Sequence, residues 1–280
     1  MSLFQLILLS VVQGVTEWLP ISSSGHVLLV AAWFGLVGED ELLINAMAHI
    51  GTLGSVLIYF WKDVWRAFRG ALGLIGISAE PADRHLALLI IAATPIALII
   101  AASFTLLPDE ITLGLRSLWV VIATTVGFGL LLWWADRQIG LKAEGEMSLL
   151  DAALIGASQA IAAIMPGTSR SGITMTVARA RGFSRPEAAR FSMLIGIPII
   201  AASGAYAFLE LAGAEPGAIS LSMQDGLLVA GLSFFAGYVS IAALMSLLQR
   251  MSFLPFVIYR LVLGAALLLA SPVGLALIPA

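Results

Sequence analysis

Two short polar segments of an otherwise apolar chain hold the residues best suited to chemistry. The first, Gln13 to His26, has the sequence QGVTEWLPISSSGH; the second, Pro166 to Thr174, has the sequence PGTSRSGIT. Each places serine or threonine and glycine directly before an apolar stretch, which is typical of a helix N-terminus. Free backbone N–H groups and the positive end of the helix dipole make such termini anion sites. Plain helix capping is the alternative explanation for the serines.

Glu17 and Arg170 favour a functional site over plain capping. An ionisable group at membrane depth costs roughly 2.5–3.5 kcal/mol on insertion scales, and such residues are functional by default. The planar fork of the Arg170 guanidinium suits bidentate phosphate binding better than a lysine would. A buried structural ion pair between the two residues is the alternative.

Three further side chains could join these two. His26 follows the serine cluster, so we expect it to reach the same site, where an imidazole suits proton transfer near neutral pH. Gln13 lies one helical turn before Glu17, and this i, i+4 spacing puts both on one helix face. His49, inside the first long apolar stretch, could be either functional or merely hydrogen-bonded.

Composition places these residues in a membrane. The 280 residues are 60% hydrophobic and 11% charged, whereas soluble domains carry about 25% charged residues. The net charge of −3 gives no indication of nucleic-acid binding. Without cysteine there is no disulfide framework, thiolate chemistry or cysteine-ligated metal. The first residues lack a basic start and a cleavage site, so we expect no signal peptide.

Six apolar stretches are long enough, or nearly so, to cross a hydrocarbon core that needs about 20 residues. They run from Leu42 to Trp61, Leu86 to Leu107, Ser117 to Ala135, Phe191 to Leu209, Gly226 to Leu248 and Pro255 to Pro272. Shorter stretches flank the polar segments: Ser2 to Thr16 with Val27 to Gly38, and Ala152 to Met165 with Ile173 to Ala178. Short helices meeting at a polar turn indicate re-entrant hairpins, although each pair could join into an ordinary span. We therefore expect an all-α integral membrane protein with six transmembrane helices and two re-entrant helical hairpins.

Loop charges predict the orientation. With re-entrant hairpins, one face collects Lys62, Arg66, Arg69, Arg84, Arg137, Lys142, Arg179, Arg181, Arg185, Arg190 and Arg250. The opposite face holds Arg116 with Glu39, Asp40, Glu41, Asp109, Glu110, Glu210, Glu215 and Asp225. The positive-inside rule makes the first face cytoplasmic. We expect a multi-pass protein of the bacterial plasma (inner) membrane, with both termini outside and the active site open to the outer, periplasmic face.

The two halves of the chain resemble each other. Gln13 and Pro20 bracket six residues, as do Gln159 and Pro166, and Arg116 and Arg260 mark corresponding spans. Each half would hold one hairpin and three spans. Because three is an odd number of crossings, the second half starts on the opposite side of the membrane and must be inverted relative to the first. Inverted repeats place binding sites near the midplane, where discontinuous helices meet. The expected division is a first inverted repeat over residues 1–140 and a second over 147–280, together one membrane domain.

The two polar segments resemble the paired signatures of the undecaprenyl-diphosphate phosphatase (bacitracin-resistance) family. One signature is acid-or-Gln, three residues, Glu, then a serine-rich turn and His; the other is proline-glycine-x-serine-arginine-serine. The resemblance covers essentially the whole chain. It implies hydrolysis of undecaprenyl diphosphate to undecaprenyl phosphate and inorganic phosphate, which recycles the lipid carrier of cell-wall synthesis.

The same resemblance assigns roles. The catalytic residues would be Glu17, Ser23, His26 and Arg170, and the substrate-binding residues Gln13, Ser22, Ser24, Gly25, Thr168, Ser169, Ser171 and Gly172. Ser23, or a water in its place, would attack the terminal phosphorus while His26 or Glu17 takes the proton. A divalent cation, with Mg²⁺ expected and Ca²⁺ an alternative, would meet Glu17. Gln13 stands where other members have a second glutamate, which weakens a two-carboxylate metal site.

The expected partners are a polyprenyl diphosphate lipid substrate and membrane lipids, with no nucleic acid and with a homodimer left open. The main rival function is an inverted-repeat transporter or flippase for a lipid phosphate, because broken helices in inverted repeats are typical of transporters. Such a carrier would use the same anion site without hydrolysis.

Overall fold

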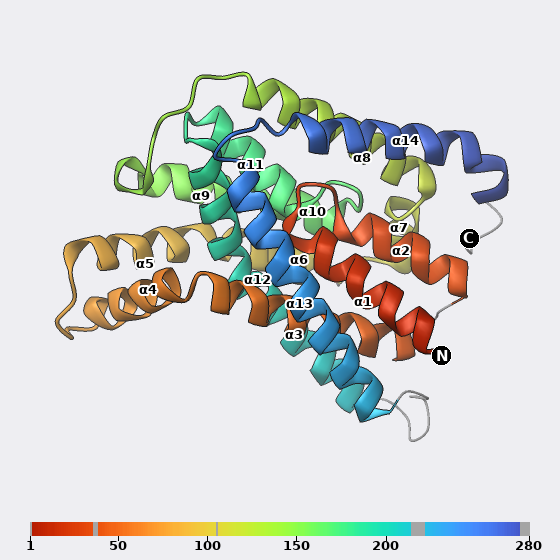
Figure 1. Ribbon diagram of the computed structural model, residues 1–280. Coiled ribbons are helices and arrows are strands. Elements are labelled where there is room, and N and C mark those ends of the chain that lie inside the picture. Colours follow the sequence, from red (N-terminus) through yellow and green to blue (C-terminus); the bar gives the residue numbers. More distant parts are fainter. Residues whose placement is uncertain (1, 36–38, 105, 214–221, 275–280) are drawn as a thin grey trace.

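The computed structural model describes residues 2–35, 39–104, 106–213 and 222–274. Over these ranges the chain consists of helices and turns, with one isolated bridge between Lys142 and Phe183. Five helical segments in them are long and apolar enough to cross a bilayer: Leu42–Tyr59, Pro81–Phe104, Leu118–Asp136, Arg185–Leu209 and Met223–Leu247. The protein is therefore an all-helical, multi-pass membrane protein (Figure 1).

The expected spans fall on these helices. Four of them correspond to α3 (Glu39–Tyr59), α8 (Leu118–Asp136), α12 (Arg185–Ala212) and α13 (Met223–Leu247). The sixth falls on α14 (Leu254–Gly274), whose apolar run Leu254–Leu269 is shorter than the other five. The sixth crossing and the re-entrance of the hairpins stay predictions.

The second expected span is apolar as predicted but consists of two helices. α5 (Pro81–Ala93) ends before Thr94, and α6 (Pro95–Phe104) begins directly after it. Pro95 has no N–H to continue the helical ladder, and its ring restricts the residue before it. The proline therefore divides the crossing.

The remaining helices are shorter. The first hairpin consists of α1 (Leu3–Trp18) and α2 (Ser23–Phe34), and the second of α9 (Leu149–Ala157), α10 (Gln159–Ile164) and α11 (Arg170–Ala180). Segments expected as loops also contain helix: α4 (Trp61–Leu74), α7 (Asp109–Leu115) and the 3-10 turn η1 (Glu144–Glu146).

The turns of the two hairpins are in contact. The Ser171 hydroxyl, on the second turn, donates to the Leu19 carbonyl of the first at 2.9 Å. Ser22 and Ser169 each stand immediately before a helix, and each has a positive φ, 75° and 70°. Positive φ is uncommon outside glycine, and such strained residues cluster at functional sites. Corresponding strained serines on both turns agree with two related halves.

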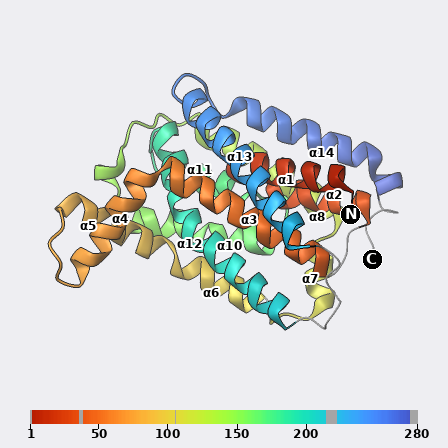
Figure 2. The same ribbon diagram turned by 60° about the horizontal axis from the view of Figure 1, so that its bottom comes forward.

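The loops predicted to share the basic face lie together at one end of the molecule. The Phe253 amide donates to Asp136 at 3.0 Å, and Arg185 reaches the same carboxylate at 2.7 Å. Arg66 pairs with Glu144 at 2.8 Å. Helices α4 and α5 are at this end, whereas the start of α1 and the end of α14 lie at the other (Figures 1 and 2).

Candidate active site

Glu17, in the last turn of α1, is the centre of a buried cluster where the two hairpin turns meet. It is 7% exposed. Its carboxylate accepts hydrogen bonds from Gln13 Nε2 at 3.0 Å, Ser23 Oγ at 2.7 Å and Arg170 at 3.2 Å. The bond from Gln13 follows from the i, i+4 spacing within one helix. Ser23 and Arg170 are the first residues of α2 and α11, so two helix N-termini adjoin the carboxylate.

The Arg170 guanidinium is fixed on two sides. It stacks over the Trp18 ring, 5.1 Å from the ring centroid, and donates to the Ser192 carbonyl at 3.3 Å. Its Nε is buried and has no hydrogen-bond partner in the described part of the chain. An unsatisfied buried donor costs about 1–3 kcal/mol. An incoming anion would offer this group an acceptor.

The other residues of the second turn hold its shape. Ser169 caps α11 by accepting from the Gly172 amide at 3.1 Å. Thr168 is fully buried and donates to the Met165 carbonyl at 2.7 Å. The Ser171 hydroxyl is engaged by the first turn, as described above. The candidate substrate-binding residues of this turn therefore form the wall of the site through their backbone and hydroxyl groups.

On the first turn, Ser22 immediately precedes α2, and its Oγ accepts a hydrogen bond at 3.4 Å from the amide of Gly25 in the first turn of that helix. The side chain of Ser24 lies outside the described residues. All these candidates are thus near the meeting point of the two turns, but only Gln13, Ser23 and Arg170 hydrogen-bond to Glu17 in the described structure.

The structure places the two histidines differently relative to Glu17. His26 hydrogen-bonds through Nδ1 to the Ser22 carbonyl and through Nε2 to the Tyr259 hydroxyl, each at 2.6 Å. Both ring nitrogens are therefore engaged away from the carboxylate. His49 is the nearer imidazole: its Nε2 lies 4.0 Å from the Glu17 carboxylate and 3.4 Å from Gln13 Nε2.

Arg260, on α14, is a site residue that the sequence pattern marks only as a repeat position. It is fully buried. Its guanidinium donates five hydrogen bonds, to the carbonyls of Pro20, Thr124, Thr125, Gly167 and Thr168. These carbonyls belong to both hairpin turns and to α8, so Arg260 ties the three together. An arginine inside an apolar span is a functional candidate by default, and this signal could have identified it.

The charges of the cluster favour an anion. Arg170 pairs with the one carboxylate, Glu17, while Arg260 is buried against carbonyls of both hairpin turns, and the N-termini of α2 and α11 add partial positive charge. Neither arginine is matched by a second acidic side chain in the described residues. A phosphate group at this point would meet fixed donors and an excess of positive charge.

The donor set also suits a hard cation bound together with a phosphate. Within the described residues no three histidine, aspartate or glutamate side chains form a metal cluster. The oxygen atoms of Glu17, Ser23 and the Gln13 side-chain amide are the ligands that such a cation would use. Mg²⁺ characteristically uses one or two carboxylates, several waters and substrate phosphates, so these residues fit it better than an all-protein cage would.

An apolar groove begins beside the cluster. It has a volume of about 150 Å³ and is lined by His49, Ile50 and Leu53 of α3 and by Ile200, Ala201, Gly204, Ala205 and Phe208 of α12. His49 borders both the groove and the Glu17 carboxylate. At the far end of the groove from His49, Phe208 is 43% exposed. The groove therefore links the polar cluster with the lipid-facing surface of two spans.

Fold and site together define an integral membrane protein with a buried anion site beside an apolar groove. A family model described as bacitracin resistance protein BacA matches residues 6–266. The chain belongs to this family. It is 54% identical over 279 residues to the undecaprenyl-diphosphatase of Hyphomonas neptunium, covering 98% of each chain. It is 46% identical over 269 residues to the undecaprenyl-diphosphatase of Maricaulis maris, covering 96% of this chain and 98% of that one.

Proposed function

We propose that this protein hydrolyses undecaprenyl diphosphate to undecaprenyl phosphate and inorganic phosphate, and so returns the lipid carrier to cell-wall synthesis. The observation that carries the proposal is the 2.7 Å hydrogen bond from Ser23 Oγ to the Glu17 carboxylate, beside Arg170. A hydroxyl nucleophile paired with a base and an anion-binding arginine is the arrangement that phosphoryl transfer requires. The names of the relatives favour hydrolysis over transport of a lipid phosphate.

In the mechanism, Arg170 and the N-termini of α2 and α11 bind the diphosphate and stabilise its developing charge. Glu17 accepts the proton of Ser23 as Ser23 Oγ bonds to the terminal phosphorus. The anhydride P–O bond breaks, and its electron pair leaves with undecaprenyl phosphate. Water then cleaves the phosphoserine and releases inorganic phosphate. A water in place of Ser23 would give the same products in one step, again with Glu17 as the base.

Glu17 is the base that the geometry supports, because it accepts a hydrogen bond from Ser23 whereas His26 is bonded to Tyr259. A divalent cation, Mg²⁺ foremost, would be held by Glu17, Ser23 and the Gln13 carbonyl oxygen. When bound, it would supply positive charge beside the phosphate oxygens.

The lipid part of the substrate needs an apolar path. The groove between α3 and α12 starts at His49, beside Glu17, and reaches exposed Phe208. The prenyl chain would lie in this groove and continue among the lipid tails. The headgroup would enter from the outer, periplasmic face, on which the first hairpin would open.

The test is phosphate release from undecaprenyl diphosphate by the purified protein in detergent. We expect Ser23→Ala and Glu17→Gln to lose at least about a hundredfold in kcat. The matched control is Ser10→Ala, since Ser10 is a buried serine of the same helix α1 that donates only to the Leu6 carbonyl. Substrate binding without any phosphate release by the unaltered protein would reject hydrolysis in favour of a carrier.

A further inference from the structure

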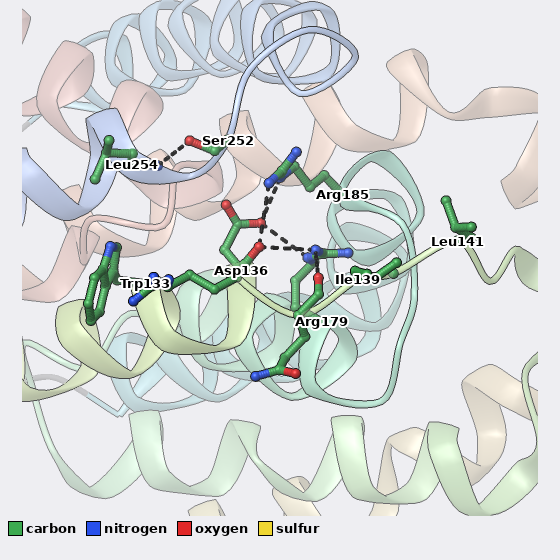
Figure 3. Close-up of a pocket in the computed structure, with 11 residues that line it drawn as sticks. Trp133, Asp136, Ile139, Leu141, Arg179, Arg185, Ser252 and Leu254 are labelled. Atoms are coloured by element: carbon green, nitrogen blue, oxygen red, sulfur yellow. Dashed lines mark hydrogen bonds and ion pairs between the residues drawn. The ribbon is translucent and has the colours of Figure 1, made fainter.

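A second polar pocket lies at the basic end of the molecule, away from the hairpin turns. It has a volume of about 460 Å³. It opens between the end of α8, the loop that follows α8, the end of α11, the start of α12 and the turn before α14 (Figure 3). Trp133, Arg137, Arg179, Arg185 and Leu254 are among the residues that line it. Nothing in the proposed hydrolysis uses this pocket.

The charge of the lining is positive. Three arginines, Arg137, Arg179 and Arg185, face one carboxylate, Asp136. Asp136 is buried and accepts from Arg179 Nε at 3.1 Å and from Arg185 Nε at 2.7 Å (Figure 3). One carboxylate cannot neutralise three guanidinium groups, so the pocket keeps an excess positive charge.

Arg179 is structural. Besides Asp136, its guanidinium donates to the carbonyls of Phe183 and Gln138, and its side chain is only 3% exposed. These contacts tie the end of α11 to the loop after α8. Its donors are therefore committed to holding the pocket, and a ligand must be bound by the other two arginines.

Arg137 and Arg185 have donors to spare. The Arg185 side chain is 35% exposed, and its contacts all go to Asp136 through Nε and one terminal nitrogen. Arg137 is exposed and stacks on Trp133, with its guanidinium carbon 4.8 Å from the ring centroid. Over the described residues its side chain makes no ion pair or hydrogen bond. Two guanidinium groups thus face one pocket with unfilled N–H groups.

The rim of the pocket is apolar. Ile139 and Leu141 are 89% and 84% exposed, and Trp133 and Leu254 are also exposed. Exposed apolar side chains beside a tryptophan and arginines are characteristic of the membrane–water interface. Basic pockets between membrane helices bind the headgroups of anionic lipids. A basic interior with an apolar rim matches a molecule that carries both a phosphate and acyl chains.

We propose that this pocket binds the phosphate of an anionic phospholipid from the adjacent leaflet, through Arg137 and Arg185, with the acyl chains against Trp133, Ile139 and Leu141. Free inorganic phosphate offers the same anion chemistry without the apolar part. The apolar rim favours the lipid. The site is independent of the Glu17 cluster and requires no catalysis.

The experiment is native mass spectrometry of the intact purified protein titrated with phosphatidylglycerol, against phosphatidylcholine and inorganic phosphate as competitors. We expect Arg137→Gln and Arg185→Gln each to weaken phosphatidylglycerol binding about fivefold. The matched control is Arg250→Gln, which removes an exposed arginine in the turn before α14 that does not line the pocket. The affinity of this variant for phosphatidylglycerol should stay within about twofold of the unaltered protein.

The outcomes separate the sources of the anion. Binding of phosphatidylglycerol that depends on Arg137 and competes with phosphate supports the site. Binding of phosphate alone, without the lipid, overturns the lipid assignment. An equal loss of phosphatidylglycerol affinity in Arg250→Gln, or no loss in Arg137→Gln, overturns the proposed binding site. Either result would mean that the lipid is attracted by diffuse surface charge. Arg137→Gln remains decisive if Arg185→Gln fails to fold, because the Arg137 side chain stacks only on exposed Trp133 and makes no ion pair or hydrogen bond in the described part of the chain.

Discussion

At the scale of single residues, the site depends on one carboxylate that serves three partners. Glu17 accepts from Gln13, Ser23 and Arg170 at once. This combination orients the serine hydroxyl and holds the guanidinium beside it, with Trp18 behind. Arg170 Nε is buried without an acceptor in the described structure, so this donor stays open to a ligand while another nitrogen of the guanidinium pairs with Glu17.

We expect Arg170→Lys to lower kcat/KM about a hundredfold while the protein still folds. The lysine keeps the charge but replaces a planar fork with a point charge, so bidentate contact with phosphate is lost. The measurement is phosphate release in detergent, with exposed Arg250→Lys as the control. Near-normal turnover would restrict Arg170 to pairing with Glu17.

Gly196 on α12 sets the position of the Arg170 guanidinium. A Cβ at Gly196 would lie 2.7 Å from Arg170 Cζ, which is too close for both to stay in place. We expect Gly196→Ala to raise KM for undecaprenyl diphosphate by about tenfold, because the displaced guanidinium loses phosphate contacts. Gly231→Ala, on α13 with open space around it, is the control and should change neither KM nor melting temperature. An unchanged KM in Gly196→Ala would show that the guanidinium can move without cost to binding.

At the scale of elements, the hairpin turns need an external tie, because each is a non-helical segment among helices. Backbone carbonyls at membrane depth are tolerated only when protein or water satisfies them. Arg260 does this for three carbonyls of the turns, those of Pro20, Gly167 and Thr168, and its other two donors bind carbonyls of α8. The last helix thus determines whether the two turns stay together.

We expect Arg260→Lys to lower the melting temperature in detergent and to abolish most activity. Lysine has three donors, so at least two of the five hydrogen bonds are lost, and each turn carbonyl left unsatisfied costs about 1–3 kcal/mol. The control is Arg116→Lys, at the corresponding place of the first half, where the arginine is exposed. Unchanged stability in Arg260→Lys would mean that water can replace the missing donors.

The groove between α3 and α12 gives a separate test of substrate recognition. Gly204→Leu should fill the groove and raise KM for undecaprenyl diphosphate several-fold, whereas KM for a short-chain diphosphate such as farnesyl diphosphate should stay near its original value. Gly231→Leu, on an exposed position of α13, controls for adding a leucine to a span. Equal losses for both substrates would place the prenyl chain elsewhere.

Element types and the meeting of the turns were predictable from the sequence, whereas side-chain partners were not. Uniform apolarity predicts the spans, and charge at membrane depth predicts Glu17 and Arg170. The choice between His26 and His49 depends on how α2 and α3 are rotated about their axes, and spacing along one helix carries no such information. The break at Pro95 did not follow from local chemistry alone, because Pro198 also removes a donor yet lies inside the continuous helix α12.

At the scale of the whole molecule, charge and shape divide the protein into two ends. The basic loops interlock at one end: Arg66 contacts Asp63, Asp83 and Glu144. Burial alone would raise the pKa of Glu144, but the hydrogen bonds and positive charges of Arg66 and Arg190 lower it below its ordinary value. The carboxylate therefore stays ionised at neutral pH, and the interlock between α4, η1 and α12 stays intact.

The orientation of these two ends in the membrane can be tested with two glycines. Gly114, on α7, and Gly145, in η1, are both exposed and have open space where a side chain would be added. Because the chain has no cysteine, Gly114→Cys and Gly145→Cys each introduce a single thiol without crowding a neighbour. The positive-inside rule predicts that Gly145 lies in the cytoplasm with the eleven basic residues and that Gly114 lies outside.

A membrane-impermeant maleimide should therefore label Gly114→Cys in intact spheroplasts, and Gly145→Cys only after the membrane is opened. Each variant is the control for the other, since both thiols should react equally in detergent. The expected pattern would place the opening of the first hairpin, with Glu17 and Ser23, on the outer side, from which the proposed substrate would enter. The reverse pattern would invert the topology and require the diphosphate to reach Glu17 from the cytoplasm.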